Sequence, residues 1–109
     1  MNIYNNFKFF DTVLTPQTSN VLSNVNQSQL VLQVGGTATS FVIEVSGRVN
    51  IESANFETIG VFNNTDFSTS QSITANGIYT IGIDGYSEIK AEIKSVSGGS
   101  VTAFGKVGE

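Results

Sequence analysis

The feature that most constrains this chain is an alternation of apolar and polar residues that recurs over residues 39–105. Phe41, Ile43 and Val45 alternate with polar side chains. The same spacing returns at Tyr79, Ile81 and Ile83 and at Ile89, Ala91 and Ile93, with glycine or asparagine between the runs. Because successive side chains of a strand point to opposite faces, a period of two indicates strands with one buried face. The sequence therefore predicts a β-sheet protein.

The apolar composition supports the same prediction. Isoleucine and valine together number 22, against 4 leucines and 5 alanines, and β-branched side chains pack well on a pleated sheet and poorly in a helix. A length of 109 residues suits one domain with a single core. We expect one domain over residues 1–109.

About eight short strands are expected. They are residues 3–14, 30–34, 39–49, 58–62, 72–74, 78–84, 88–96 and 101–107. With no alternation of strands and helices, this pattern predicts an all-β fold: a single antiparallel β-sandwich, of jelly-roll or immunoglobulin-like type, without substantial helix. The polar segment 15–29 is expected to be a long loop or a short edge strand.

Two pairs of turn residues predict hairpins. Gly35-Gly36 predicts one between 30–34 and 39–49, and Asn76-Gly77 predicts one between 72–74 and 78–84.

The segment 88–96 also permits a helical interpretation, because Ile89, Ile93 and Val96 have helical spacing. On a helix, however, Glu88 and Glu92, and likewise Lys90 and Lys94, would form like-charged pairs four residues apart. A strand places all four charges on its outer face, so we predict a strand.

Composition also excludes classes of function. The chain has neither histidine nor cysteine, which removes the usual acid–base group near neutral pH, the thiolates and the common nitrogen and sulfur metal ligands. We therefore expect no enzyme, no metal and no cofactor.

The net charge of −4, with five cationic residues, predicts that neither nucleic acid nor a membrane is a partner. The start MNIYNNFKFF lacks a secretory-signal pattern and no stretch approaches the ~20 apolar residues of a membrane span, so we expect a complete, soluble chain made in a cytoplasm.

Four acidic residues are candidates for a catalytic site. Glu52 with Glu57, or Asp84 with Glu88, could supply the two carboxylates of a glycosidase. Asp-Gly is a common turn pair, however, and glutamates at strand edges are usually solvated, so a structural interpretation is favoured.

The polar cluster Asn63, Asn64, Thr65 and Asp66 is dense enough to suggest calcium, but it contains one carboxylate. A loop whose side chains bond their own backbone explains it better. Asn26-Gln27-Ser28 and Asn63-Asn64-Thr65 match the glycosylation acceptor pattern, as chance allows in so polar a chain. Gly82 and Gly85 are interpreted as strand and turn residues rather than a phosphate cradle, because no helix follows them.

Aromatic residues supply the remaining candidates. Tyr4, Phe7, Phe9 and Phe10 form a cluster in which Phe7 and Phe9 share one strand face and Phe10 takes the other. The cluster is either ordinary core, or residues 1–14 form an N-terminal arm that docks on a neighbouring subunit by strand addition. In the second case, deleting residues 1–14 would lower the oligomeric mass and leave a folded domain.

A second aromatic set, Tyr79, Tyr86 and Phe104, could stack on sugars. The alternation places Tyr79 on the inward side, and Phe104 is expected to cover a sheet edge.

Residues 40–105 contain, in order, SFVIEVSGRVN, TIGVFNNTDFS and ITANGIYTIGIDGYSEIKAEIKSVSGGSVTAFG. This order resembles small β-sandwich modules of tailed-bacteriophage virion proteins, which share a G-x-Y-x-I-x-x-x-G-Y/F hairpin and a G-G-x-V-T-x-x-G ending, here Gly98 to Gly105. A tryptophan common in the short strand of such modules is absent.

The resemblance implies a non-enzymatic virion structural protein, such as a capsid decoration, head-fibre, neck or tail accessory component. It implies a protein made in the host bacterial cytoplasm, located in the virion and bound to itself and to other virion proteins. We accordingly expect a homo-oligomer with Tyr4, Phe7, Phe9 and Phe10 at or near the contact. The alternative is an extracellular adhesion or carbohydrate-binding β-sandwich module, and carbohydrate is an expected partner only in that case.

Overall fold

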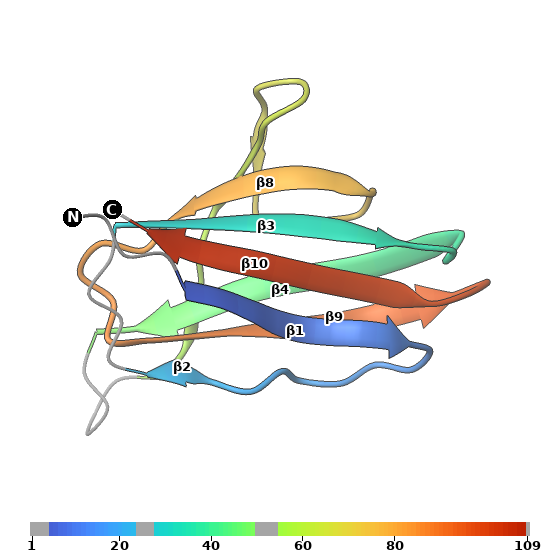
Figure 1. Ribbon diagram of the computed structural model, residues 1–109, viewed down its shortest axis with the longest axis horizontal. Coiled ribbons are helices and arrows are strands. Elements are labelled where there is room, and N and C mark those ends of the chain that lie inside the picture. Colours follow the sequence, from blue (N-terminus) through green and yellow to red (C-terminus); the bar gives the residue numbers. More distant parts are fainter. Residues whose placement is uncertain (1–4, 24–27, 50–54, 109) are drawn as a thin grey trace.

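The computed structural model describes residues 5–23, 28–49 and 55–108, which form two packed antiparallel sheets (Figure 1). The six-stranded sheet has the order β1 (Asn5–Val13), β10 (Val101–Gly108), β3 (Gln29–Gly36), β8 (Gly77–Gly82), β6 (Val61–Asn63) and β7 (Thr69–Ser70). The four-stranded sheet has the order β2 (Leu22–Ser23), β9 (Glu88–Ser97), β4 (Ser40–Arg48) and β5 (Glu57–Thr58). The predicted all-β sandwich is confirmed, and the described residues contain ten strands rather than about eight.

The core lies between the sheets and follows the sequence alternation. In β4, Phe41, Ile43 and Val45 are buried while Glu44 and Ser46 are half-buried on the outer face. The largest fully buried side chains come from both sheets: Leu30, Leu32, Ile43, Ile73, Ile81, Ile83, Ile89, Ile93, Val45 and Val101. Burial of these apolar groups is the main force that holds the sheets together.

The segment 88–96 is a strand, as its charges predicted. In β9 the buried residues Ile89, Ala91 and Ile93 alternate with charged residues, and the strand pairs with β4 over its length. The helical interpretation is excluded.

Both hairpin predictions are wrong. Although Gly35-Gly36 ends β3, that strand pairs with β10 and β8, whereas β4 pairs with β9 and β5 in the other sheet. Gly36 has a φ of 119°, and the chain then crosses between the sheets, with the N–H groups of Thr37 and Ala38 both donating to the carbonyl of Ser100 at 3.0 Å. A Cβ at Gly36 would lie 2.3 Å from that oxygen, so glycine serves a close crossing here rather than a hairpin turn.

The segment before Asn76-Gly77 likewise leaves the sheet. Ile73 and Ile43 of β4 exchange two backbone hydrogen bonds of 2.8 and 2.9 Å, while β8 pairs with β3 and β6. The side chain of Ile73 is fully buried. Burial of that isoleucine beside the opposite sheet explains why 72–74 does not pair with β8.

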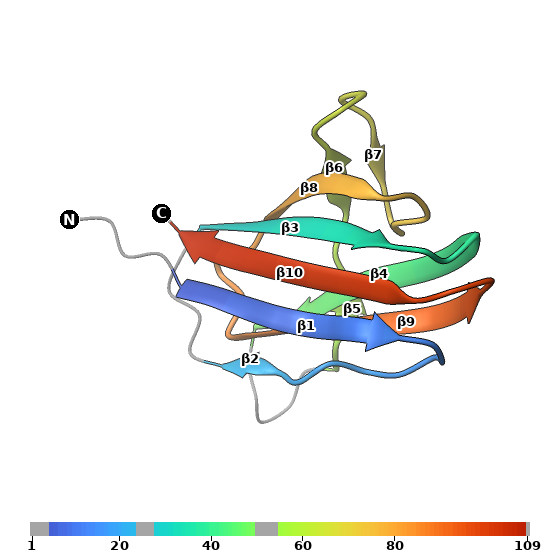
Figure 2. The same ribbon diagram turned by 45° about the vertical axis from the view of Figure 1, so that its right-hand side comes forward.

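The predicted strand 58–62 is divided between the sheets. β5 pairs with β4, the N–H of Ile59 donates to the carbonyl of Val45 at 2.8 Å, and after Gly60 the chain enters β6 of the other sheet. Beyond β6 the chain forms a short hairpin with β7 that extends past the sandwich (Figure 2). Alternation continues through Ile59 and Val61, both buried, so the pattern alone does not reveal the change of sheet.

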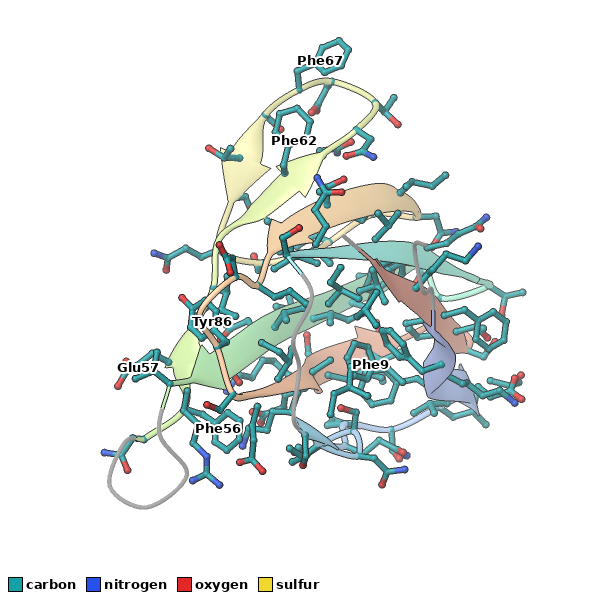
Figure 3. The ribbon with its side chains drawn as sticks, turned by 60° about the vertical axis from the view of Figure 1, so that its left-hand side comes forward. Phe9, Phe56, Glu57, Phe62, Phe67 and Tyr86 are labelled. Atoms are coloured by element: carbon teal, nitrogen blue, oxygen red, sulfur yellow. The ribbon has the colours of Figure 1, made fainter. Side chains whose placement is uncertain are left out.

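The first strand lies at the edge of its sheet, yet its aromatic residues belong to the core. Phe9 and Phe10 are 8% and 2% exposed, and Phe9 lies between the sheets in Figure 3. The prediction that Phe10 faces away from Phe9 is wrong, because the register with β10 shifts between Lys8 and Phe10. A bulge of this kind sets two residues against one on the partner strand, and here it turns both rings inward.

The segment 15–29 contains the short edge strand that was expected as one of two alternatives. β2 pairs with β9, and Thr18 forms a bridge to Glu92 of the same strand. In the part of the chain that the structure describes, no helix has the length and apolarity to cross a membrane.

Candidate interaction surface

The structure does not assemble the carboxylates into a catalytic pair. Glu88 accepts a hydrogen bond of 2.7 Å from Nε of Arg48, and its other oxygen accepts one from Ser23 Oγ at 3.1 Å. Asp84 and Glu57 are exposed, and Glu52 lies outside the described residues. Within the described ranges, no group of three or more acidic, cysteine or histidine residues could hold a metal ion.

The loop around Asn63 and Asp66 bonds to itself, which confirms the structural interpretation. Asn63 Oδ1 accepts the N–H of Thr65 at 2.8 Å. Asp66 Oδ1 accepts both the N–H and the hydroxyl of Ser68, at 3.0 and 2.6 Å. These donors, the hydroxyl first, hold the pKa of Asp66 below its ordinary value of 3.8. The acceptor pattern at Asn26 lies outside the described residues.

The aromatic residues proposed for sugar stacking do not gather. Tyr79 is inward and 4% exposed, as predicted, and its hydroxyl donates to the carbonyl of Ala75 at 2.7 Å. Tyr86 is half-buried against the core. Phe104 does not cover an edge, because β10 lies between β1 and β3, and its ring is 45% exposed on the outer face of the sheet.

The N-terminal aromatics are packed against their own chain. Phe7 and Phe9 meet edge to face with ring centroids 4.7 Å apart, and Tyr4 lies outside the described residues. What β1 offers a neighbour is therefore its backbone edge. That edge carries two register shifts and an exposed Lys8–Asp11 ion pair of 3.0 Å, features that commonly discourage strand addition. The contact at this strand stays a prediction.

The outer face of the six-stranded sheet is a different surface, which the sequence pattern did not reveal. Its exposed apolar side chains, which we call the apolar face, are Val31, Phe62, Phe67, Ile78 and Phe104. The strand register sets four of them in two adjoining rows, with Gln33 between Phe104 and Ile78 and Thr80 between Val31 and Phe62.

A shallow hollow of about 220 Å³ lies between side chains of the two rows. It is lined by Val31, Gln33, Ile78, Phe104, Gly105 and Lys106. Exposed apolar side chains that adjoin one another are typical of a surface that binds a protein.

Phe67 is the most exposed of these residues, at 74%, and it lies on the loop between β6 and β7 (Figure 3). Its ring centroid is 6.1 Å from that of Phe62. Its φ of 63° is in the left-handed region, which costs roughly 1–2 kcal/mol for a residue with a Cβ. The loop is nevertheless held by two 2.8 Å backbone hydrogen bonds, from Phe67 N–H to Asn63 and from Asn63 N–H to Ser68.

Charge is distributed unevenly over the molecule. β10, β3, β8, β6 and β7 together contain one charged residue, Lys106, and β1 adds Lys8 and Asp11, which pair. By contrast β4 and β9 contain six charged residues: Glu44, Arg48, Glu88, Lys90, Glu92 and Lys94. Arg48 and Lys90 lie 4.6 and 4.3 Å from the centroid of the Phe56 ring. The four-stranded sheet therefore has a solvated outer face and the six-stranded sheet has the apolar face.

Comparison with known proteins places this fold. The model of the XepA family matches residues 4–107. The chain belongs to the XepA family. Two solved structures share the XepA-family fold at 22–23% sequence identity. The crystal structure of the SPBc2 prophage-derived protein YomS gives a TM-score of 0.88 at 23% identity, over 100% of this chain and 96% of YomS. The crystal structure of the PBSX exported protein XepA gives a TM-score of 0.88 at 22% identity, over 99% of this chain but 38% of XepA. No curated protein matches the chain.

Proposed function

We propose that this XepA-family protein is a non-enzymatic structural component of a phage virion, and that it acts by protein–protein assembly through the apolar face. The observation that carries the proposal is Phe67, an aromatic side chain held in the open at a cost in backbone strain. Strain of that kind is usually tolerated where the residue has a function.

Three further points support assembly rather than chemistry. The chain has neither histidine nor cysteine, and its described carboxylates are paired or exposed on the surface. The apolar face joins Phe67 to exposed side chains from β10, β3, β8 and β6. The neighbour YomS, which this chain matches from end to end, is described as prophage-derived. A capsid decoration, head-fibre, neck or tail accessory role fits these features, and we propose a homo-oligomer.

The alternative is an extracellular adhesion or carbohydrate-binding β-sandwich module. The relative XepA is described as exported, so location separates the two functions. Purified particles of a phage that encodes the protein are needed to distinguish the two functions.

The test is an immunoblot of density-gradient fractions, together with the mass of the purified protein by light scattering at high micromolar concentration. We expect the protein to sediment with the particles. Absence from the particles would contradict the virion location, and retention on host cell wall would then favour the alternative. A monomer would contradict the homo-oligomer and self-assembly through the apolar face, and a monomer that is also absent from particles would contradict assembly with other virion proteins as well.

A further inference from the structure

The β6–β7 hairpin has a second side, opposite its two exposed phenylalanines, and it borders a hollow of about 250 Å³. Nine residues line the hollow, among them Val61, Asn63, Asp66, Ser68, Thr74 and Tyr79. Seven of these nine residues carry a polar side-chain group. Pockets that hold drug-sized ligands have volumes of about 300–1,000 Å³. The hollow is slightly smaller than these, and its volume suits a single sugar ring.

Some of the polar groups are held in place by the protein and others remain available. Asp66 accepts both donors of Ser68 through Oδ1, and neither of these bonds uses its Oδ2. Asn63 accepts through Oδ1, which leaves its amide N–H groups as donors. The hydroxyl of Tyr79 donates to Ala75 and can still accept. The hollow thus presents fixed acceptors and donors side by side.

The chemistry of the lining selects among ligand classes. The Asp66 carboxylate, ionised at neutral pH, disfavours an anion. One carboxylate is too few for a calcium ion, which takes six to eight oxygen ligands. An apolar ligand would leave the hydroxyl and amide groups without partners, at a cost of about 1–3 kcal/mol for each buried group. A neutral polyhydroxylated molecule satisfies both donors and acceptors.

We propose that this hollow binds a neutral sugar ring, with Asp66 Oδ2 and the Asn63 amide as its main hydrogen-bonding groups. The sugar would contact the Val61 and Tyr79 side through its C–H groups. This site is independent of the apolar face, so it holds whether or not the chain assembles through Phe67.

The test is titration of isotope-labelled protein with glucose, galactose and N-acetylglucosamine, followed by amide chemical shifts. We expect saturable shifts confined to residues 61–79 for at least one sugar. Asp66→Asn keeps the Oδ1 acceptor but removes the charge, and it should weaken binding by about tenfold or more, the size of one lost charged hydrogen bond. Thr74→Val, which removes an exposed hydroxyl from the rim, is the second variant and should weaken binding less.

Two controls separate the outcomes. Asp84→Asn, at an exposed turn outside the hollow, and Phe104→Ser, on the apolar face, should both leave sugar affinity unchanged. Co-sedimentation with purified cell-wall polysaccharide distinguishes a sugar at a chain end from a free monosaccharide. Absence of saturable shifts with all three sugars and the polysaccharide would overturn the proposal, as would binding that Asp66→Asn and Thr74→Val leave intact.

Discussion

At the scale of single residues, Phe67 combines an exposed side chain with a strained backbone conformation. Its ring is mostly in solvent and its φ is 63°, a conformation that asparagine adopts far more readily than phenylalanine. The sequence did not single it out, because it follows the polar run Asn63 to Asp66 outside any alternating pattern. The signal available was its type: phenylalanines flank that run on both sides, at 62 and 67.

Replacing this residue should not reduce stability. We expect Phe67→Asn to raise the free energy of unfolding by up to about 1 kcal/mol, because relief of roughly 1–2 kcal/mol of strain exceeds the loss of an exposed contact with Phe62. Thr12→Asn is the matched control, since Thr12 has a φ of 56° within strand β1, and it should also stabilise. Urea denaturation measures both. A loss of more than about 1 kcal/mol for Phe67→Asn alone would show that its ring is structural.

The Asp66 carboxyl provides a prediction about pH. Ser68→Ala removes the hydroxyl that is the largest cause of the lowered pKa of Asp66, so that pKa should rise toward 3.8. A depressed folded-state pKa contributes stability that is present above the unfolded value and is lost as pH falls through the folded value. The variant should therefore lose less stability on acidification than the parent.

Carboxyl titration by NMR gives the measurement. Asp11, whose pKa is lowered chiefly by its hydrogen bond from Lys8, is the internal reference and should not change. If Ser68→Ala leaves the pKa of Asp66 unchanged, the backbone N–H of Ser68 rather than its hydroxyl is what lowers that pKa.

At the scale of elements, alternation predicted which residues form strands and which face is buried, but not which sheet each strand joins. The same period of two is satisfied in either sheet of a sandwich. Gly36 and Gly60 lie where the chain changes sheet, and their sequence context is indistinguishable from that of a hairpin turn or an uninterrupted strand. The bulge at Phe9 escaped prediction because one extra residue shifts the period without any change in composition.

The first strand gives the element-scale prediction. Deleting residues 1–14 removes Phe9 and Phe10 from the core and exposes the edge of β10. Truncating one buried phenylalanine typically costs about 3–5 kcal/mol, and a domain of this size has about 5–15 kcal/mol in total. We therefore expect the truncated chain to be unfolded, in contrast to the folded product that a docking arm would leave.

Far-ultraviolet circular dichroism and thermal unfolding check this expectation. A truncated chain with a cooperative transition and an all-β spectrum would restore the arm interpretation. The contribution of the β1 backbone edge to assembly would then have to be measured directly.

At the scale of the whole molecule, the two sheets present different surfaces. Six charged residues lie in β4 and β9, whereas five strands of the other sheet contain one. The sequence could have shown this contrast only after the strands had been assigned to sheets, because strands of both kinds alternate along the chain. It predicted assembly, but at the N-terminal strand rather than at this face.

Light scattering of one double variant shows whether the chain assembles through the apolar face. Phe62→Ser with Phe67→Ser removes the two exposed rings of the hairpin, and Val49→Ser, at a large exposed apolar residue outside the face, is the control. We predict that the parent and the control have a mass that is a multiple of 11.6 kDa at high micromolar concentration, and that the double variant is a folded monomer. A parent that is itself monomeric, or a double variant that keeps the parent's mass, would contradict assembly through this face.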